Sequence, residues 1–170
     1  MNGEYRIRMA YQAILNHDFE QAIEWFEQAV REEPDNADYH YRLSITYARS
    51  NKLSSALKLA KRAAALDPQH EVYGTHSRNL QGRELAQKAS KLMEQGTGDW
   101  SRAAALLRRA IRLDGLNLEA HMLLGMAYMG LRRYSQAEEA LREALKLDPG
   151  REEAQTMLKQ LNDRAKLSKR

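Results

Sequence analysis

The chain has 170 residues, of which 43% are hydrophobic and 7% aromatic, with a formal net charge of +4 and no cysteine. This length suits one domain, and the lack of cysteine excludes disulfides, cysteine-ligated zinc and a thiol nucleophile. The N-terminal segment lacks the apolar core of a signal peptide and no 18-residue apolar run occurs, so we expect a cytoplasmic protein that does not insert into a membrane.

Good helix formers dominate the composition. Alanine, leucine, glutamate, lysine, arginine and glutamine are the main residue types, and only three prolines and nine glycines occur. Runs in which β-branched residues alternate with polar ones are missing, so we expect no β-sheet. The chain is therefore predicted to be all-α.

Turn signals recur at a fixed interval. Pro34 and Pro68 are 34 residues apart, and so are Gly115 and Pro149. The interval from Pro68 to Gly115 is 47 residues, which is thirteen longer. A period of this length is typical of stacked helix pairs. The turns predict four units, at about residues 3–36, 37–70, 71–117 and 118–150.

The second helix of each unit carries one pattern of large residues and alanines. Its members are Phe19, Ala22, Phe26 and Ala29; Leu53, Ala56, Ala60 and Ala63; Trp100, Ala103, Leu107 and Ala110; and Tyr134, Ala137, Leu141 and Ala144. Alanines at these offsets lie on one face of a helix, where small side chains let a second helix approach closely.

The first helix of each unit has its own small residue. Ala10, Ser44 and Gly125 occupy equivalent positions. A glycine inside a helix costs about 1 kcal/mol relative to alanine. We interpret Gly125 as the point where the partner helix crosses nearest the backbone, so that close packing offsets this cost.

The third unit holds the thirteen extra residues. Two lengthen its inner turn, at residues 95–99, and eleven extend the helix that begins near Glu71. Eleven residues make three helical turns plus about 20°, so the helix keeps nearly the same face inward. The preferred register aligns Ala89 with Gly125, and an alternative places Ala86 there. Gly74 and Gly82 could instead break this segment into two helices.

The last segment is predicted to be a capping helix over residues 151–166. Ala154, Met157, Leu158 and Leu161 form one apolar stripe on it, and the other face is charged. Such a helix covers the core that the last repeat would otherwise expose.

The small and large residues at these positions of a 34-residue helix pair resemble those of the tetratricopeptide repeat family. The resemblance covers about residues 3–149. It implies a right-handed α-solenoid of nine helices forming one domain over residues 1–170. It also implies a non-catalytic scaffold or adaptor that holds a peptide or helix of another protein in a concave groove lined by the first helices.

The first-helix residues that point away from the packing positions define what this groove offers. They form one stripe in each unit because they follow i, i+4, i+7 spacing. The stripes are Ile7, Tyr11 and Ile14; Tyr41, Ile45 and Ala48; Ala86, Ser90 and Met93; and Met122, Met126 and Met129. Aromatic and methionine side chains suit an amphipathic helix or an apolar peptide. The same residues could instead pack against neighbouring first helices and complete the core.

Arginines border these stripes. They are Arg42, Arg49, Arg78 and Arg83. Of these we select Arg49 and Arg83 as candidate contacts that favour a ligand both acidic and apolar. Solvated or internally paired arginines are the alternative.

The residue types needed for chemistry do not come together in the sequence. None of the five histidines has another histidine at i+3 or i+4, so no helical metal pair exists. His40 and His121 take equivalent positions, which favours a packing role. No phosphate-binding glycine loop and no nucleophile–base arrangement occurs. We therefore expect no enzyme activity, no cofactor and no metal.

Two other functions remain as alternatives. A self-assembling oligomeric scaffold would fill the groove with a second copy of the chain. A basic helical-repeat protein that binds nucleic acid would fit the pI of 9.3 and the net charge of +6 over residues 35–115. The basic clusters lie mostly on second helices or turns without interleaved aromatics, which disfavours nucleic acid.

Overall fold

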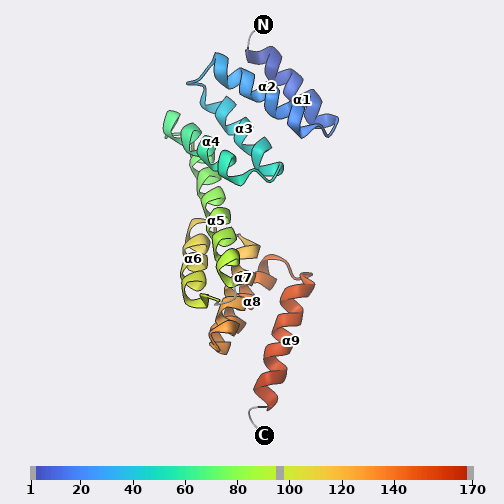
Figure 1. Ribbon diagram of the computed structural model, residues 1–170, viewed down its shortest axis with the longest axis vertical. Helices are drawn as coiled ribbons and strands as arrows, with labels where there is room; N and C mark the ends of the chain where they lie inside the picture. Colours follow the sequence, from blue (N-terminus) through green and yellow to red (C-terminus); the bar gives the residue numbers. More distant parts are fainter. Residues whose placement is uncertain (1–2, 95–97, 168–170) are drawn as a thin grey trace. The chain divides into compact units, whose positions relative to one another are not determined.

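The computed structural model describes residues 3–94 and 98–167 of the chain. This part folds into nine α-helices and contains no strand (Figure 1). The helices are α1 (Gly3–Leu15), α2 (Phe19–Glu32), α3 (Ala37–Arg49), α4 (Leu53–Leu66), α5 (Glu71–Glu94), α6 (Trp100–Leu113), α7 (Leu118–Gly130), α8 (Tyr134–Leu147) and α9 (Glu152–Leu167). The predicted all-α fold of repeated helix pairs is confirmed. Of the inner turn predicted at residues 95–99, residues 95–97 lie outside the described part.

Polar side chains fix where four of the helices begin. The carboxylate of Asp18 accepts the backbone N–H of Gln21 at 3.0 Å, and Asp99 caps α6 in the same way. Asn36 and Asn117 cap α3 and α7 through their side-chain oxygens. Each cap satisfies a backbone donor that has no partner within its helix.

The turn inside each helix pair contains a residue in the left-handed region. His17, Asn51, Gly98 and Arg132 have φ values between 40° and 59° and stand at equivalent positions, two residues before the second helix. The positive φ reverses the chain within a few residues, so that the two helices of a pair pack antiparallel.

The small-residue position brings the two helices of a pair together. A Cβ atom added at Gly125 would lie 2.7 Å from Cγ of the buried Leu141 on α8. At the equivalent position on α3, the hydroxyl of Ser44 donates to the carbonyl oxygen of Ala56 on α4 at 2.7 Å. The close approach predicted for Gly125 is therefore confirmed.

At a larger scale than the four helix-pair repeats, the chain divides into two compact units, Met1–Leu80 and Gln81–Arg170. From here on, the first unit and the second unit mean these two parts. The first unit has two core clusters, one centred on Phe26 and one on Ala56 and Leu57. Tyr47 packs against both clusters, and Leu80 from α5 belongs to the second. The first part of α5 thus covers the core of the α3–α4 pair.

The second unit has one continuous core. Leu107 of α6 and Leu141 of α8 are fully buried in it, and Leu85, Ala86 and Ala89 of α5 join them. On the far side, α9 contributes Ala154 and Leu161. The single domain predicted from the sequence stays a prediction, because each unit is compact by itself.

Helix α5 runs without a break for 24 residues through Gly74 and Gly82. A Cβ atom at Gly82 would lie 3.4 Å from Asp114, much as one at Gly3 would meet Glu33. These contacts match Gly82 with Gly3, which supports the register that aligns Ala89 with Gly125.

Candidate functional site

On the first-helix face of the first unit, the side chain of Tyr11 is 41% exposed. Its ring meets the buried ring of Phe26 edge-on, with centroids 5.8 Å apart, and the guanidinium of Arg42 lies 5.4 Å from its centroid. Arg42 also donates to the Tyr11 hydroxyl and forms an ion pair with Asp38 at 2.5 Å. Tyr11 is therefore held in place while part of its ring stays accessible.

Tyr41 lies against the beginning of α5. Its ring centroid is 5.0 Å from that of Tyr73 and 5.1 Å from that of His76. Burial raises the pKa of the Tyr73 hydroxyl above its usual value. A hollow of about 360 Å³ opens beside Tyr41, with Val72 and Thr75 of α5 among its lining residues.

The other predicted residues of this unit differ in accessibility. Ile7 is half-buried and packs against the core cluster of Phe26. Ile45 is half-buried, and Arg49 is exposed. The first-helix face of this unit is thus part core and part surface.

A larger hollow of about 460 Å³ lies between α5 and α7 in the second unit. Its lining residues are Arg83, Ala86, Gln87 and Ser90 of α5, Glu119 and Leu123 of α7, and Asp114 and Asn117 of the turn before α7. The Asn117 side-chain oxygen caps α7 by accepting from Ala120, whereas its buried amide nitrogen has no hydrogen-bond partner among the described residues. An apolar wall with polar groups on its rim suits a peptide that carries both kinds of side chain.

The predicted methionines of this unit differ in exposure. Met126 is 39% exposed, whereas Met122 is 6% exposed and belongs to the core. Met93 and Met129 are half-buried and pack against the same core. Of the two arginines selected from the sequence as candidate contacts, Arg83 lines the hollow.

Sequence reasoning missed Glu119 and Leu123, which line the hollow from α7. Their i, i+4 spacing was visible in the sequence. It did not single them out, because Met122, Leu123 and Leu124 are consecutive and all apolar. The assignment to partner binding stays a prediction for Ile7, Tyr11, Tyr41, Ile45, Arg49, Arg83, Met93, Met122, Met126 and Met129.

The histidines at equivalent positions have a structural role. Nε2 of His40 lies 2.8 Å from the carbonyl oxygen of Pro34, and Nε2 of His121 lies 3.1 Å from that of Gly115. Each imidazole thus ties the start of a first helix to the turn before it. The packing role predicted for this pair is confirmed.

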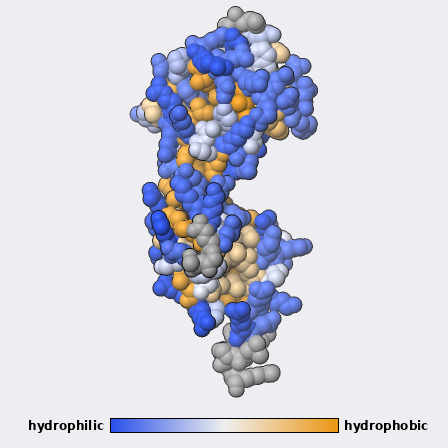
Figure 2. Space-filling view, viewed as in Figure 1, coloured by the Kyte–Doolittle hydropathy of each residue, from blue (hydrophilic) through white to orange (hydrophobic). Residues whose placement is uncertain are grey.

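Apolar surface is visible on both units in Figure 2, interrupted by hydrophilic residues. Within residues 3–94 and 98–167, no cluster of three or more histidine, aspartate or glutamate side chains could hold a metal ion. No helix in the same ranges is both long and apolar enough to cross a membrane.

Comparison with protein families matches residues 13–78 and 92–161 to the model described as "Tetratricopeptide repeat", which is more than half of the chain. Among curated proteins, the chain is 28% identical over 149 residues to the TPR repeat-containing protein YpiA of Bacillus subtilis strain 168. That match includes 86% of this chain and 31% of YpiA, so the chain spans about a third of its relative.

Solved structures with the same fold include two forms of MamA. The MamA fragment from residue 41 to the end, from Desulfovibrio magneticus RS-1, is 19% identical, with a TM-score of 0.59 over 96% of this chain and 85% of that chain. MamA from AMB-1 is 18% identical, with a TM-score of 0.58 over 96% of this chain and 82% of that chain. At these identities the likeness shows the fold alone.

Proposed function

The chain belongs to the tetratricopeptide repeat family, and from this premise we propose that it is a non-catalytic adaptor that binds a peptide or an amphipathic helix of another protein. Repeats of this family generally mediate protein–protein interactions. The proposed binding surfaces are the first-helix faces of each unit, around Tyr41 and around Met126.

The hollow between α5 and α7 is the observation that carries this proposal. It combines apolar lining from Ala86 and Leu123 with polar groups at Arg83, Gln87 and Glu119. Such a mixture binds the apolar side chains of a peptide while its backbone and charged groups stay solvated or hydrogen-bonded. Met126, exposed on the same helix as Leu123, extends the apolar surface with a side chain that adapts to different ligands.

The test is a pull-down from lysate with the wild-type chain and with Met126→Asp or Tyr41→Asp. A carboxylate in the middle of an apolar contact is costly to bury, so these variants are expected to lose partners that the wild type captures. Leu116→Asp is the control, since Leu116 is 78% exposed in the turn before α7 and does not line the hollow.

Circular dichroism of each variant decides how the pull-down is interpreted. Retained helical signal with lost partners supports the proposal. Unfolding of Tyr41→Asp and Met126→Asp assigns these residues to the core instead. Equal loss of partners in Leu116→Asp would contradict a binding surface on the first-helix faces.

A further inference from the structure

Helices α2 and α6 hold the same place in their helix pairs but carry opposite charge. Their buried residues correspond one to one: Ala22, Phe26 and Ala29 match Ala103, Leu107 and Ala110. Four glutamates and one arginine lie on α2, whereas α6 carries four arginines and no acidic residue. The two helices can therefore be compared position by position for the ion pairs and hydrogen bonds that their charged side chains form.

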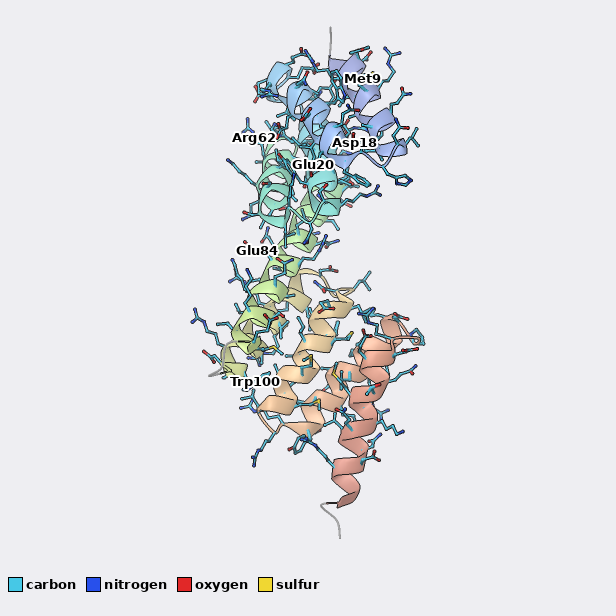
Figure 3. All side chains as sticks on the ribbon, turned by 45° about the vertical axis from the view of Figure 1, so that its right-hand side comes forward. Met9, Asp18, Glu20, Arg62, Glu84 and Trp100 are labelled. Carbon is cyan, nitrogen blue, oxygen red and sulfur yellow. The ribbon has the colours of Figure 1, made fainter. Side chains whose placement is uncertain are left out.

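In the first unit, three of the four α2 glutamates, Glu20, Glu27 and Glu32, have partners within the unit. Glu20 of α2 accepts from Lys52 at 2.6 Å, and Asp35 forms an ion pair with Arg62 at 2.9 Å. Glu27 accepts a hydrogen bond from the Tyr47 hydroxyl. Glu20 and Arg62 are labelled in Figure 3.

In the second unit, other residue types replace the acidic residues that form these interactions in the first unit. Ser101 and Leu116 stand where the first unit has Glu20 and Asp35, and Arg108 stands where it has Glu27. The arginine side chains of α6 are Arg102, Arg108, Arg109 and Arg112. All four are exposed, and none has an ion pair or hydrogen bond among the described residues. The fold of the second unit thus leaves a row of cations without partners.

Two of these arginines form one wall of a groove of about 350 Å³ between α6 and α8. Arg108 and Arg112 line it from α6, and Glu139 and Glu143 line it from α8. Glu143 already forms an ion pair with Lys146 of the same helix at 2.5 Å, so the acidic wall depends mainly on Glu139. Ile111, Leu124 and Ala140 supply its apolar surface. The groove therefore has a basic wall, an acidic wall and apolar side chains between them.

We propose that this α6–α8 groove binds an amphipathic helix of a partner protein that carries acidic residues along one edge, basic residues along the other and an apolar stripe between. A helix of this kind places each charged edge against the wall of opposite sign while its stripe covers the apolar lining. Nucleic acid or an anionic bilayer would instead bring phosphates against Glu139 and Glu143, which repel them. This surface is separate from the hollow between α5 and α7.

The test measures binding of three designed fluorescent peptides to the full chain by anisotropy. The peptides share one apolar stripe and differ in their edges, which are acidic and basic, both acidic, or both basic. The wild type is expected to bind the mixed peptide roughly fivefold more tightly than either of the others, because only the mixed peptide avoids facing like charges.

The double variant Arg108→Glu with Arg112→Glu makes both walls acidic. Its preference is expected to change to the peptide with two basic edges, a gain of binding that an unfolded chain cannot show. Lys61→Glu with Lys91→Glu changes the net charge equally at two exposed lysines outside the groove, so this control is expected to keep the wild-type preference.

Three results would overturn the proposal. The first is a wild type that does not discriminate between the peptides. The second is a double variant that keeps the wild-type preference. The third is binding of single-stranded RNA or of phosphatidylglycerol vesicles that exceeds peptide binding and disappears in the double variant, which would assign the arginines to a polyanion.

Discussion

At the scale of single residues, close approach outweighs helix propensity. Gly125 lies where a Cβ atom would come within 2.7 Å of two carbon atoms of Leu141. Because Leu141 is fully buried, its side chain has no free space into which to move. Gly74 stands in a helix as well, but nothing lies within 4 Å of a Cβ atom added there. The two glycines therefore form a matched pair.

Gly125→Ala is predicted to destabilise the chain by about 1–2 kcal/mol, because overpacking the helix crossing exceeds the gain of about 1 kcal/mol in helix propensity. Gly74→Ala is predicted to stabilise it by about 0.5–1 kcal/mol, since only the propensity gain applies. Urea denaturation followed by circular dichroism measures both changes. Equal effects at the two sites would contradict the close crossing at Gly125.

The hydroxyl of Tyr47 makes the free energy of unfolding depend on pH in the alkaline range. Burial, aided by the hydrogen bond to Glu27, raises the pKa of its hydroxyl to about 12. Between the ordinary tyrosine pKa of about 10 and this value, the unfolded chain has lost the proton that the folded chain still holds. The free energy of unfolding therefore falls as pH rises through this window, and the contribution is fully present below it.

Tyr47→Phe is predicted to reduce that alkaline fall, since phenylalanine has no proton to lose. Urea denaturation of wild type and variant at about pH 9 and about pH 11 measures it, the two values lying on either side of the ordinary tyrosine pKa. Any constant cost of the lost hydrogen bond cancels in the difference between the two pH values. A fall as steep in the variant as in the wild type would show that other groups cause it.

At the scale of elements, α5 has two structural roles along its length. The segment 66–80 begins Leu-Asp-Pro as segment 147–161 does, and Tyr73 and Leu80 match Ala154 and Leu161 of α9. All four side chains are buried. The beginning of α5 thus caps the first unit as α9 caps the second, and its remainder is the first helix of the next pair. This double role explains the additional residues of the third helix-pair repeat, residues 71–117.

Leu80→Ala is predicted to destabilise the chain by about 2–4 kcal/mol, because it opens a cavity in the core of the α3–α4 pair. Val72→Ala on the same helix is the control, with an expected change of at most about 0.5 kcal/mol, since Val72 is 48% exposed. Thermal and urea denaturation measure both. If the two variants lost the same stability, the beginning of α5 would not act as a cap.

Most of the helix pairs could be predicted because each depends on local signals. Alanines, large residues and turn residues recur at fixed positions, and Gly125 with Ser44 indicated the close crossing. The residues of the left-handed turn positions could not all be predicted, since Arg132 is a type that seldom adopts positive φ, unlike His17, Asn51 and Gly98.

The exposed face of α7 was also beyond sequence reasoning. From Ala120 to Tyr128 the side chains are buried except at Met126. Helices α6 and α8 both pack against α7, so apolar residues surround most of its axis and no single stripe marks the core. The sequence pattern therefore placed Met122 on the binding face, whereas its side chain is buried in the core.

At the scale of the whole molecule, repeat architecture makes stability a local property that neighbouring helices share. Each pair contacts the pairs next to it, so a defect in one pair is expected to weaken its neighbours first. The boundary between the two compact units falls within α5, between Leu80 and Gln81, and the helix continues through it without a break.

Leu107→Ala tests how far a defect spreads. Leu107 is fully buried in the core of the second unit, so its truncation should cost about 2–5 kcal/mol there. Hydrogen exchange followed by mass spectrometry is predicted to show a large loss of protection in α6, α7 and α8, a smaller loss in α5, and the smallest in α1 and α2. Phe26→Ala, in the first unit, should give the reverse gradient. A uniform loss of protection in both variants would show that all the repeats unfold as one cooperative domain, since a defect then lowers the free energy of a single global opening rather than of its own neighbourhood.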